Sequence, residues 1–298
     1  MKVGFIGCVE SSAKFLEVLC AIERDDIEVV GVVTLSASAV NSDYCDLAPI
    51  CSRYDIPYFY HERSNAAGSR EFLKELTPDV IYCFGWSYLL DESVLSIAPF
   101  GVIGFHPAKL PQNRGRHPII WALALGLEET ASTFFKMDLG ADSGPILSQK
   151  LIKIESCDNA TSLYEKILAI AKRQVHQLTI DLADGVAIFQ EQDHDSATHW
   201  RKRSRKDGLI DWRMHASTVH NLVRALSRPY PGAEFIFEGQ HIQVWDSEVA
   251  EKAYPKNIEP GTVLEVNANS FVVKCADITA INIKEISPQI ELEKGRYL

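Results

Sequence analysis

Two segments of the sequence carry side chains that could pass a proton between reacting atoms. The stretch GVIGFHPAKLPQNRGRHPIIWAL, which begins at Gly101, runs from five apolar or small residues directly into His106. The stretch FFKMDLGADSGPILSQ places Asp138 and Asp142 in a glycine-punctuated loop between two strand-like runs. A carboxylate beside an imidazole fixes its tautomer and favours its charged form. Such a pair can accept a proton from an amine nucleophile and later donate one to a leaving group.

Each of these residues also has a purely structural explanation. Taken alone, His106 fits equally well a hydrogen-bonded histidine at the edge of a sheet. Asp142 alone is better explained by an Asx turn, in which the carboxylate bonds to nearby backbone. The chemical interpretation therefore depends on a fold that brings the two segments together.

The first two-thirds of the chain alternates between short apolar runs and amphipathic segments. The runs KVGFIG, DVIYCFG and GVIGFH are typical of buried strands, whereas SSAKFLEVLCAIE and SREFLKELT are typical of helices. This order predicts an α/β fold with a doubly wound, mostly parallel sheet that is covered on both faces. Ligands of such sheets bind outside the carboxyl ends of the strands. His106 ends one of these runs and Trp86 follows another, so we expect both at that edge.

The pattern changes after a long helix predicted over residues 159–185. A polar segment follows, and beyond it come one helical segment and several alternating strand-like runs, such as AEFIFEG and HIQVWDSEV. We expect a catalytic domain over residues 1–190, a linker over 191–206, and a small β-rich, barrel-like (OB-like) domain over 207–298. The linker ends in a basic run, Arg201, Lys202, Arg203, Arg205 and Lys206. This run fits either a phosphate-binding strip or a solvated connection between domains, and the solvated connection is the simpler interpretation.

Composition argues against several classes of function. The net charge of −10 disfavours unaided binding to nucleic acid, which draws most of its affinity from cationic contacts to phosphates. The sequence has no long apolar run typical of a membrane span and no signal-peptide pattern in MKVGFIGCVESS, so we expect a cytoplasmic protein. The first strand lacks a following G-x-G-x-x-G, and Walker A, H-E-x-x-H and paired-cysteine motifs are absent. The sequence therefore gives no support to nucleotide-dependent redox chemistry, ATP chemistry or a metal site.

The residues around His106 and Asp142 belong to a longer pattern. HPAKLPQNRGRHPIIWALALGLEETASTFFKMDLGADSGPILSQ closely resembles the H-x-x-L-L-P-x-x-R-G-x-x-P … T … D-x-G-x-D-x-G core of the 10-formyltetrahydrofolate-dependent formyltransferases. That family includes enzymes that act on methionyl-tRNA, on glycinamide ribonucleotide and on amino sugars. The segment KDGLIDWRMHASTVHNLVRALSRPYPGAEF resembles the start of their C-terminal domain. The resemblance covers both expected domains and nearly the whole chain.

The resemblance implies that a formyl group moves from the nitrogen of 10-formyltetrahydrofolate to a substrate amine through a tetrahedral intermediate. It assigns proton transfer to His106 and makes Asp142 the carboxylate that favours the protonated ring. It implies no metal. It also implies folate contacts from a strand-end segment, one arginine and one loop: Tyr88, Leu89, Leu90, Arg116, Asp138, Leu139, Gly140, Ala141 and Asp142.

One position departs from the family pattern. The family usually has an asparagine two residues before the histidine, where its amide stabilises the oxyanion, and this chain has Gly104 there. Loss of one such donor can lower the rate on the order of 10²–10³-fold. A backbone N–H, the protonated His106 or the nearby Asn113 could substitute, although Asn113 is more simply a turn residue before Arg114. Without a substitute, the protein would be a weak enzyme or a folate- or sugar-binding module without turnover.

The acceptor amine is inferred from comparison with the branches of the family. The tRNA enzymes usually carry a basic insertion after the second strand, and the corresponding TLSASAVNSDYCDLAPICSRYDIP has no lysine or arginine before Arg53. The segment RGRHPIIWALALGLEET is more similar to the R-G-R-x-P-x-x-W of the sugar enzymes. We therefore expect a small amino-sugar acceptor, free or nucleotide-linked, rather than methionyl-tRNA. His117 either contacts that sugar or only starts a helix.

Three points stay open at the level of sequence. A hydrolase of 10-formyltetrahydrofolate keeps similar catalytic residues, although such proteins typically carry a different N-terminal regulatory domain. The sequence does not identify the sugar. A homodimer is compatible with the resemblance, and no residue pattern tests it.

Overall fold

The computed structural model describes residues 1–38 and 43–298, and it divides into two compact units. Unit 1 consists of Met1–Gly115, Ala131–Ile152 and Lys166–His199. Unit 2 consists of Arg116–Thr130, Lys153–Glu165 and Trp200–Leu298. Each unit draws on several parts of the chain, and the expected domain borders at residues 190 and 207 stay predictions.

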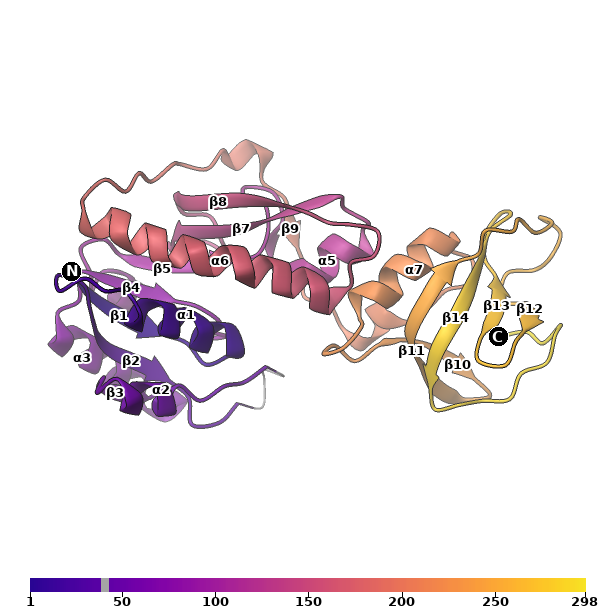
Figure 1. Ribbon diagram of the computed structural model, residues 1–298, viewed down its shortest axis with the longest axis horizontal. Coiled ribbons are helices and arrows are strands. Elements are labelled where there is room, and N and C mark those ends of the chain that lie inside the picture. The colour runs from indigo at the N-terminus through magenta and orange to yellow at the C-terminus, as the bar shows by residue number, and fades with distance from the viewer. Residues whose placement is uncertain (39–42) are drawn as a thin grey trace. The chain divides into compact units, whose positions relative to one another are not determined.

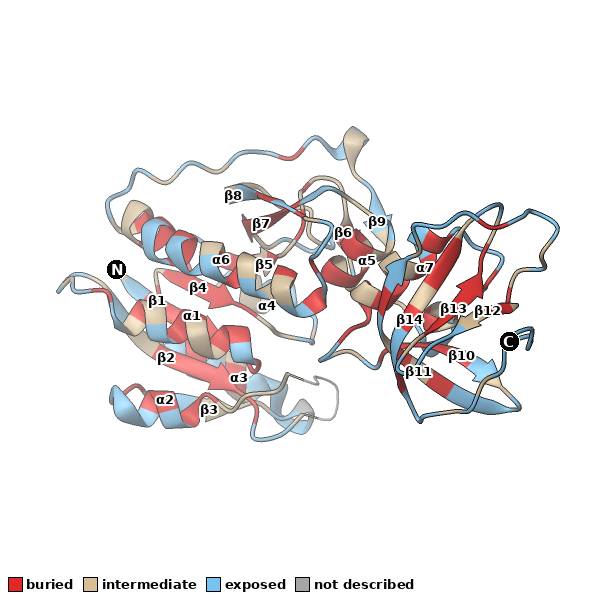
Figure 2. Cartoon of the chain, turned by 45° about the vertical axis from the view of Figure 1, so that its right-hand side comes forward, coloured by how far each residue is buried: buried red, intermediate tan, exposed pale blue. Residues whose placement is uncertain are grey.

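Unit 1 is built on a seven-stranded sheet with the order β3-β2-β1-β4-β5-β7-β8. Its strands are β1 (Lys2–Ile6), β2 (Glu28–Thr34), β3 (Tyr58–Tyr60), β4 (Val80–Cys83), β5 (Val102–His106), β7 (Glu129–Lys136) and β8 (Ile146–Lys153). β1 pairs in parallel with β2 and β4, β2 with β3, and β4 with β5, whereas β5 and β7 are antiparallel. The predicted α/β class with a mostly parallel sheet is confirmed. Figure 2 shows the inner strands β1 and β4 as almost wholly buried.

Helices cover both faces of this sheet. They are α1 (Glu10–Cys20), α2 (Ala48–Arg53), α3 (Ala66–Leu76), α4 (Glu92–Leu95) and α6 (Ala160–Ala183), with two short 3₁₀ turns, η1 (Arg63–Asn65) and η2 (His194–Ser196). Figure 1 shows α1 and α6 lying across the face of the sheet that is turned toward the viewer. On this face Phe15 of α1 packs edge-on against Phe84 and Phe105, and the Tyr82 hydroxyl bonds to Thr179 of α6.

The opposite face of the sheet carries the other half of the strand side chains, because successive residues of a strand point to opposite faces. Leu73 of α3 packs there with Ile6, Val33 and Val102, together with residues of α4. Because side chains of a strand point alternately to the two faces, Gly104 and His106 lie on the same face as Val102. The end of β5 therefore presents His106 on the α3 side of the sheet.

Unit 2 contains a five-stranded antiparallel sheet with the order β10-β11-β14-β13-β12. Its elements are α5 (Pro118–Ala124), η3 (Arg205–Gly208), α7 (Ala216–Ala225), β10 (Ala233–Phe237), β11 (Gln240–Val249), β12 (Val263–Val266), β13 (Phe271–Lys274) and β14 (Ala280–Ser287). Helix α7 packs against α5 and against β11 and β14. The predicted β-rich second region is confirmed.

Backbone bonds protect both edges of this second sheet. The N–H of Ile210 donates to the carbonyl of Glu234 on β10 at 2.7 Å, and the N–H of Val263 on β12 donates to Arg296 at 2.8 Å. Paired edges do not recruit further strands. Strands β10 and β12 lie at the two edges of the sheet, and in residues 1–38 and 43–298 they are not hydrogen-bonded to each other. A closed barrel therefore stays a prediction.

Two short strands, β6 (Arg114–Gly115) and β9 (His199–Trp200), form a separate two-stranded ladder. Within the described residues no helix is long and apolar enough to cross a membrane, and no three His, Cys, Asp or Glu side chains are grouped as metal ligands. The segment expected to lack a tRNA-type insertion includes residues 39–42, which lie outside the described residues.

Candidate active site

His106 ends β5 with its side chain buried, and its ring is held by the loop that follows. Its Nε2 lies 2.8 Å from the backbone oxygen of Asn113. A carbonyl oxygen can only accept a hydrogen bond, so Nε2 carries the proton. The loop thereby fixes the tautomer of the neutral ring and leaves Nδ1 as the nitrogen that gains or loses a proton.

Nδ1 faces Asp142. The distance from His106 Nδ1 to Asp142 Oδ2 is 3.6 Å, and the same carboxylate oxygen accepts a hydrogen bond from the Gly115 N–H at 2.8 Å. Because Nε2 is already a donor, a second proton on Nδ1 makes the ring an imidazolium, which a neighbouring carboxylate stabilises. The fold thus brings together the two residues that the sequence analysis singled out.

Both loops adopt a backbone conformation that is unusual for residues other than glycine. Asn113 has φ +65° and Asp142 has φ +54°. Asn and Asp are the residues that tolerate this left-handed region best. The turn at Asn113 aims its carbonyl at His106, and the turn at Asp142 aims its carboxylate at Gly115. Strained conformations of this kind gather at functional sites.

The loop that carries Asp142 is compact because of its glycines. A Cβ on Gly144 would lie 1.8 Å from the backbone oxygen of Lys136, and one on Gly140 would lie 2.1 Å from the Ser143 hydroxyl. Asp138 Oδ1 accepts hydrogen bonds from the Gly140 N–H at 2.9 Å and from the Ser143 hydroxyl at 2.7 Å. The Asx turn of this loop is therefore made by Asp138, whereas Asp142 makes a long-range bond.

The remaining residues with an implied folate contact lie in three places. Leu139, Gly140 and Ala141 form the exposed tip of the Asp142 loop. Arg116 is exposed and belongs to unit 2, where its N–H donates to the carbonyl of Trp200 at 3.1 Å. Their folate contacts stay predictions. The third group, Tyr88, Leu89 and Leu90, lines a cavity of unit 1.

This cavity, of about 120 Å³, lies at the carboxyl ends of the parallel strands. Ile6 of β1 and Val33 of β2 form part of its wall, and α3 and the segment after β4 form the rest. That is the position at which ligands of doubly wound sheets bind. It is also on the face of the sheet to which Gly104 and His106 point.

Aromatic rings gather in the wall of this cavity. The ring of His61 lies 5.2 Å from that of Trp86 and 5.3 Å from that of Tyr88. Burial lowers the pKa of His61, which keeps its ring neutral at neutral pH. His61 was not among the predicted site residues, although it directly follows β3 and so obeys the same strand-end rule that selected His106 and Trp86.

The space next to Gly104 is occupied. A Cβ on Gly104 would lie 2.9 Å from Met137 Cγ and 3.1 Å from Phe135 Cζ, and Phe135 is the residue directly opposite on β7. Met137 also packs against the cluster that contains Trp86 and Leu90. The chain therefore places apolar side chains where the family usually has an amide.

Three backbone donors of the loop that follows His106 are already used. The N–H of Asn113 donates to the Thr198 hydroxyl at 2.9 Å, that of Arg114 to the Thr198 carbonyl at 3.0 Å, and that of Gly115 to Asp142. In the described part of the chain, the side-chain amide of Asn113 makes no hydrogen bond. Two of the donors considered for the oxyanion are thus left in this loop: protonated His106 and the Asn113 amide.

A second residue that the sequence analysis missed holds the Asp142 loop from behind. Gln192 is buried, and its Nε2 donates to the carbonyls of Asp142 at 3.0 Å and Gly144 at 2.6 Å. It lies in the polar stretch assigned to the linker. Nothing in its local sequence distinguishes it from its exposed neighbours.

The basic run after this stretch is largely engaged within unit 2. Arg201 pairs with Asp207, and Arg205 pairs with Glu234 through two hydrogen bonds of 2.8 Å. The guanidinium of Arg203 lies 4.6 Å from the Trp121 ring. These contacts favour the simpler interpretation of the run as a structural connection.

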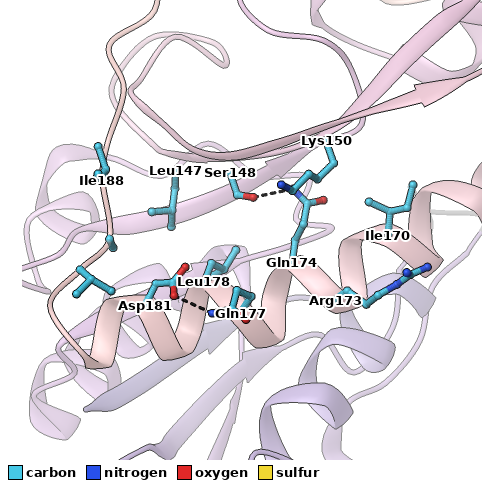
Figure 3. A pocket seen from close by; sticks show the side chains of 12 residues that line it. Leu147, Ser148, Lys150, Ile170, Arg173, Gln174, Gln177, Leu178, Asp181 and Ile188 are labelled. Atoms are coloured by element: carbon cyan, nitrogen blue, oxygen red, sulfur yellow. Dashed lines mark hydrogen bonds between the residues drawn. The ribbon is translucent and has the colours of Figure 1, made fainter.

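A larger cavity lies elsewhere in unit 1. It measures about 700 Å³ and is bounded by β8, α6 and the segment after α6. Figure 3 shows two hydrogen bonds among its polar groups, Gln174 with Ser148 and Gln177 with Asp181. Neither His106 nor Asp142 lines it. The same is true of the smaller cavity. The smaller cavity is the better candidate for the reaction because it lies at the strand ends, on the face of the sheet to which His106 points.

Comparison with known proteins bears on both units. A family model described as "Formyl transferase" matches residues 1–179, and one described as "Formyl transferase, C-terminal domain" matches residues 202–292. The bifunctional polymyxin resistance protein ArnA of Wigglesworthia glossinidia brevipalpis is 35% identical over 224 residues, which cover 75% of this chain and 33% of that protein. The chain therefore spans about a third of the length of this curated relative.

Two solved structures share the fold over nearly their whole length. An N-formyltransferase from Helicobacter canadensis, solved with folinic acid and dTDP-3-aminofucose, has a TM-score of 0.75 at 16% identity, with 95% of this chain and 99% of that chain covered. WlaRD, a sugar 3N-formyl transferase solved with dTDP and 5-N-formyl-THF, has a TM-score of 0.71 at 16% identity, with 97% and 99% covered. Because one family model spans more than half of the sequence and includes both His106 and Asp142, the chain belongs to the formyl transferase family.

Proposed function

We propose that this protein transfers the formyl group of 10-formyltetrahydrofolate to the amine of an amino sugar, and that the sugar is linked to a nucleotide. The observation that carries the proposal is the 3.6 Å approach of Asp142 to His106 Nδ1, with Nε2 fixed on the Asn113 carbonyl. This arrangement leaves one ring nitrogen for proton exchange and places a negative charge beside it.

The reaction needs one proton to change places. The amine nitrogen attacks the formyl carbon, a C–N bond forms, and the carbonyl oxygen becomes an oxyanion. Nδ1 of His106 takes the proton that the amine loses, and Asp142 stabilises the resulting imidazolium. The proton then passes to the folate nitrogen as its bond to the formyl carbon breaks, which releases tetrahydrofolate.

The cavity at the strand ends suits the flat, partly apolar ring system of a folate. His61, Trp86 and Tyr88 supply ring edges and faces, and Ile6 and Val33 supply an apolar floor. Aromatic contacts of this kind favour planar ligands. The contacts implied for Arg116 and for residues 138–142 form part of the same proposal.

The choice of an amino-sugar acceptor rests on the relatives. The two structural neighbours are described as sugar N-formyltransferases or were solved with a nucleotide-linked amino sugar, and the sequence relative is ArnA.

One observation favours a second candidate, a homologue that binds folate or sugar without turnover. Met137 and Phe135 fill the space at Gly104, so no side-chain amide is available there for the oxyanion. The active enzyme then depends on protonated His106 or on Asn113. If neither acts as a donor, binding would persist and transfer would be lost.

The deciding experiment incubates the purified protein with 10-formyltetrahydrofolate and a panel of amino sugars, each offered free and nucleotide-linked. Mass spectrometry then follows the gain of one formyl group, with His106→Asn as the matched control. We expect a nucleotide-linked sugar to be formylated by the wild type only. Formylation of methionyl-tRNA would overturn the acceptor, and folate binding in a thermal-shift assay without any transfer would support the binding homologue.

A further inference from the structure

The side chain of Gln192 connects the Asp142 loop to Arg114 and uses all of its hydrogen-bond donors and acceptors to do so. Its Nε2 donates to the carbonyls of Asp142 and Gly144, at 3.0 Å and 2.6 Å. Its Oε1 accepts from Nε and Nη2 of Arg114, at 3.2 Å and 2.7 Å. An amide has two N–H bonds and two lone pairs, so each of the four is used. Only 6% of the residue is exposed.

Arg114, on the other side of this amide, lies between the two residues that contact the acid–base pair. Asn113 accepts the hydrogen bond of His106, and Gly115 donates one to Asp142. Arg114 is buried, and besides Gln192 its guanidinium has the Nδ1 of His194 as a partner at 3.2 Å. Its position is therefore set by two side chains of the segment after α6.

The same segment fixes the His106 loop a second time. The hydroxyl and the carbonyl of Thr198 accept the N–H groups of Asn113 and Arg114. Gln192 connects this loop to the Asp142 loop through the side chain of Arg114. The separation of the two loops, and with it the distance between His106 and Asp142, is thus held by this amide together with the hydrogen bond from the Gly115 N–H to Asp142.

We propose that Gln192 is a positioning residue for the reaction, a role that rests on the proposed function. It holds the Asp142 carboxylate beside His106 Nδ1 and touches neither the formyl group nor the amine. Displacement of a reacting group by about 1 Å can cost on the order of 10²-fold in rate. A loosened Asp142 loop would produce such a displacement.

The chemistry of an amide is specific for this place. A glutamate at position 192 would still accept from Arg114, but it would set a carboxylate against the carbonyls of Asp142 and Gly144, which have no proton to donate. A methionine would keep the volume and would lose all four hydrogen bonds. Both substitutions therefore remove the two hydrogen bonds that Gln192 donates to the Asp142 loop, although they differ in what they keep. An effect that both variants share can then be attributed to the loss of these two bonds.

The experiment compares Gln192→Glu and Gln192→Met with Gln190→Glu in the full chain. Gln190 is exposed and lies two residues earlier, where only its backbone bonds to Ile146. We expect kcat to fall on the order of 10²-fold in both Gln192 variants, with KM for the sugar unchanged. The pH profile of kcat should differ from that of the wild type, because the imidazole and the carboxylate no longer face each other. Gln190→Glu should match the wild type in all three.

A second readout does not depend on turnover. Hydrogen–deuterium exchange should become faster in residues 110–115 and 138–144 of the Gln192 variants, and it should stay at the wild-type rate in Gln190→Glu. If the wild type transfers no formyl group, the proposed function fails while this exchange pattern still tests the connection. Wild-type exchange and wild-type kcat in both Gln192 variants would overturn the inference, as would a rise in exchange over the whole chain.

Discussion

Met137 covers Gly104, so that its Cγ would lie only 2.9 Å from a Cβ at that position. Gly104 belongs to β5, Met137 directly follows the antiparallel partner β7, and Phe135 of β7 completes the cover. Replacement of the family's usual asparagine by glycine is therefore coupled to a bulky apolar neighbour, and the two positions should respond to mutation together.

A double-mutant cycle tests this coupling. Gly104→Asn alone should lower the free energy of unfolding by about 1–3 kcal/mol, because it overpacks a filled space. In the background of Met137→Ala the same change should cost less, with a coupling of about 0.5–3 kcal/mol. Urea unfolding measures all four proteins. Additive effects would show that Met137 does not occupy the space at Gly104. If an amide there acts on the oxyanion, kcat of the double variant should also exceed that of Met137→Ala.

The largest loss of activity is expected from substitutions in the proposed acid–base pair, His106 and Asp142. His106→Asn and Asp142→Asn should each lower kcat by roughly 10²–10⁴-fold, the range that a positioned proton-transfer group supplies. Asp142→Asn keeps an oxygen for the Gly115 N–H, so its effect reports the lost charge rather than a lost loop contact. Formyl transfer is measured under saturating folate and sugar. Glu191→Gln, which changes an exposed carboxylate of the same unit, should keep the wild-type rate.

Gly144 sets the path of the Asp142 loop. Gly144→Ala should reduce both stability and kcat, since its Cβ would lie 1.8 Å from a backbone oxygen that has little freedom to move. The control is Gly185→Ala, where nothing lies within 4 Å and the only cost is a φ of +68°. Thermal unfolding and formyl transfer are measured for both. Equal effects of the two substitutions would show that the loop accommodates the methyl group.

The aromatic wall of the strand-end cavity gives a prediction for folate. Trp86→Ala should raise KM for 10-formyltetrahydrofolate roughly 10-fold, the equivalent of about 1.4 kcal/mol of ring contact. Trp86→Phe should recover much of that loss, and KM for the sugar should change in neither variant. Steady-state kinetics with each substrate varied in turn provides the measurement. A change confined to KM for the sugar would assign this cavity to the acceptor instead.

The stability of unit 2 should depend on pH through Glu234. This buried carboxylate accepts two hydrogen bonds from Arg205 and lies 3.1 Å from His241 Nδ1, and the Arg205 bonds hold its pKa below the usual 4.5. The unfolded chain therefore takes up this proton at a higher pH than the folded chain. The stabilisation is complete above about pH 4.5 and is lost as the pH falls through the lower, folded pKa.

Urea unfolding between neutral pH and about pH 3, a range that extends below the unfolded pKa, measures this contribution. The midpoint of the wild type should fall more steeply toward acid than that of Glu234→Gln, which lacks the titrating group. Glu291→Gln removes an exposed carboxylate and should reproduce the wild-type slope. A slope that Glu234→Gln leaves unchanged would place the acid sensitivity elsewhere.

The sequence was most informative where a residue type and its position agree. His106 ends an apolar run that could only be a buried strand, and Asp142 lies in a loop whose glycines are required by contacts with Lys136 and Ser143. Both signals are local in the chain but ambiguous when taken alone, and the resemblance to the family made these two residues predicted site residues. The strand-end rule would also have found His61, had it been applied to the short strand β3.

Other features depend on contacts between distant segments. That Met137 fills the space at Gly104 follows from the antiparallel register of β5 and β7, which periodicity does not specify. Gln192 lies in a polar stretch with no secondary-structure pattern. Its role depends on the segment after α6, which returns past the loops that contain Arg114 and Asp142. The Asx turn, which the sequence suggested for Asp142, belongs to Asp138, because both residues have the same local signal.

The path of the chain after α6 limits how the catalytic part of this protein can be transplanted. The family model that contains His106 and Asp142 ends at residue 179, yet Gln192 and Thr198 hold the loops of both residues. A chimera joined at residue 179 would contain the whole motif around His106 and Asp142 but would lack Gln192 and Thr198, which fix the loops of both residues. A graft that includes the sequence as far as His199 carries its own scaffold.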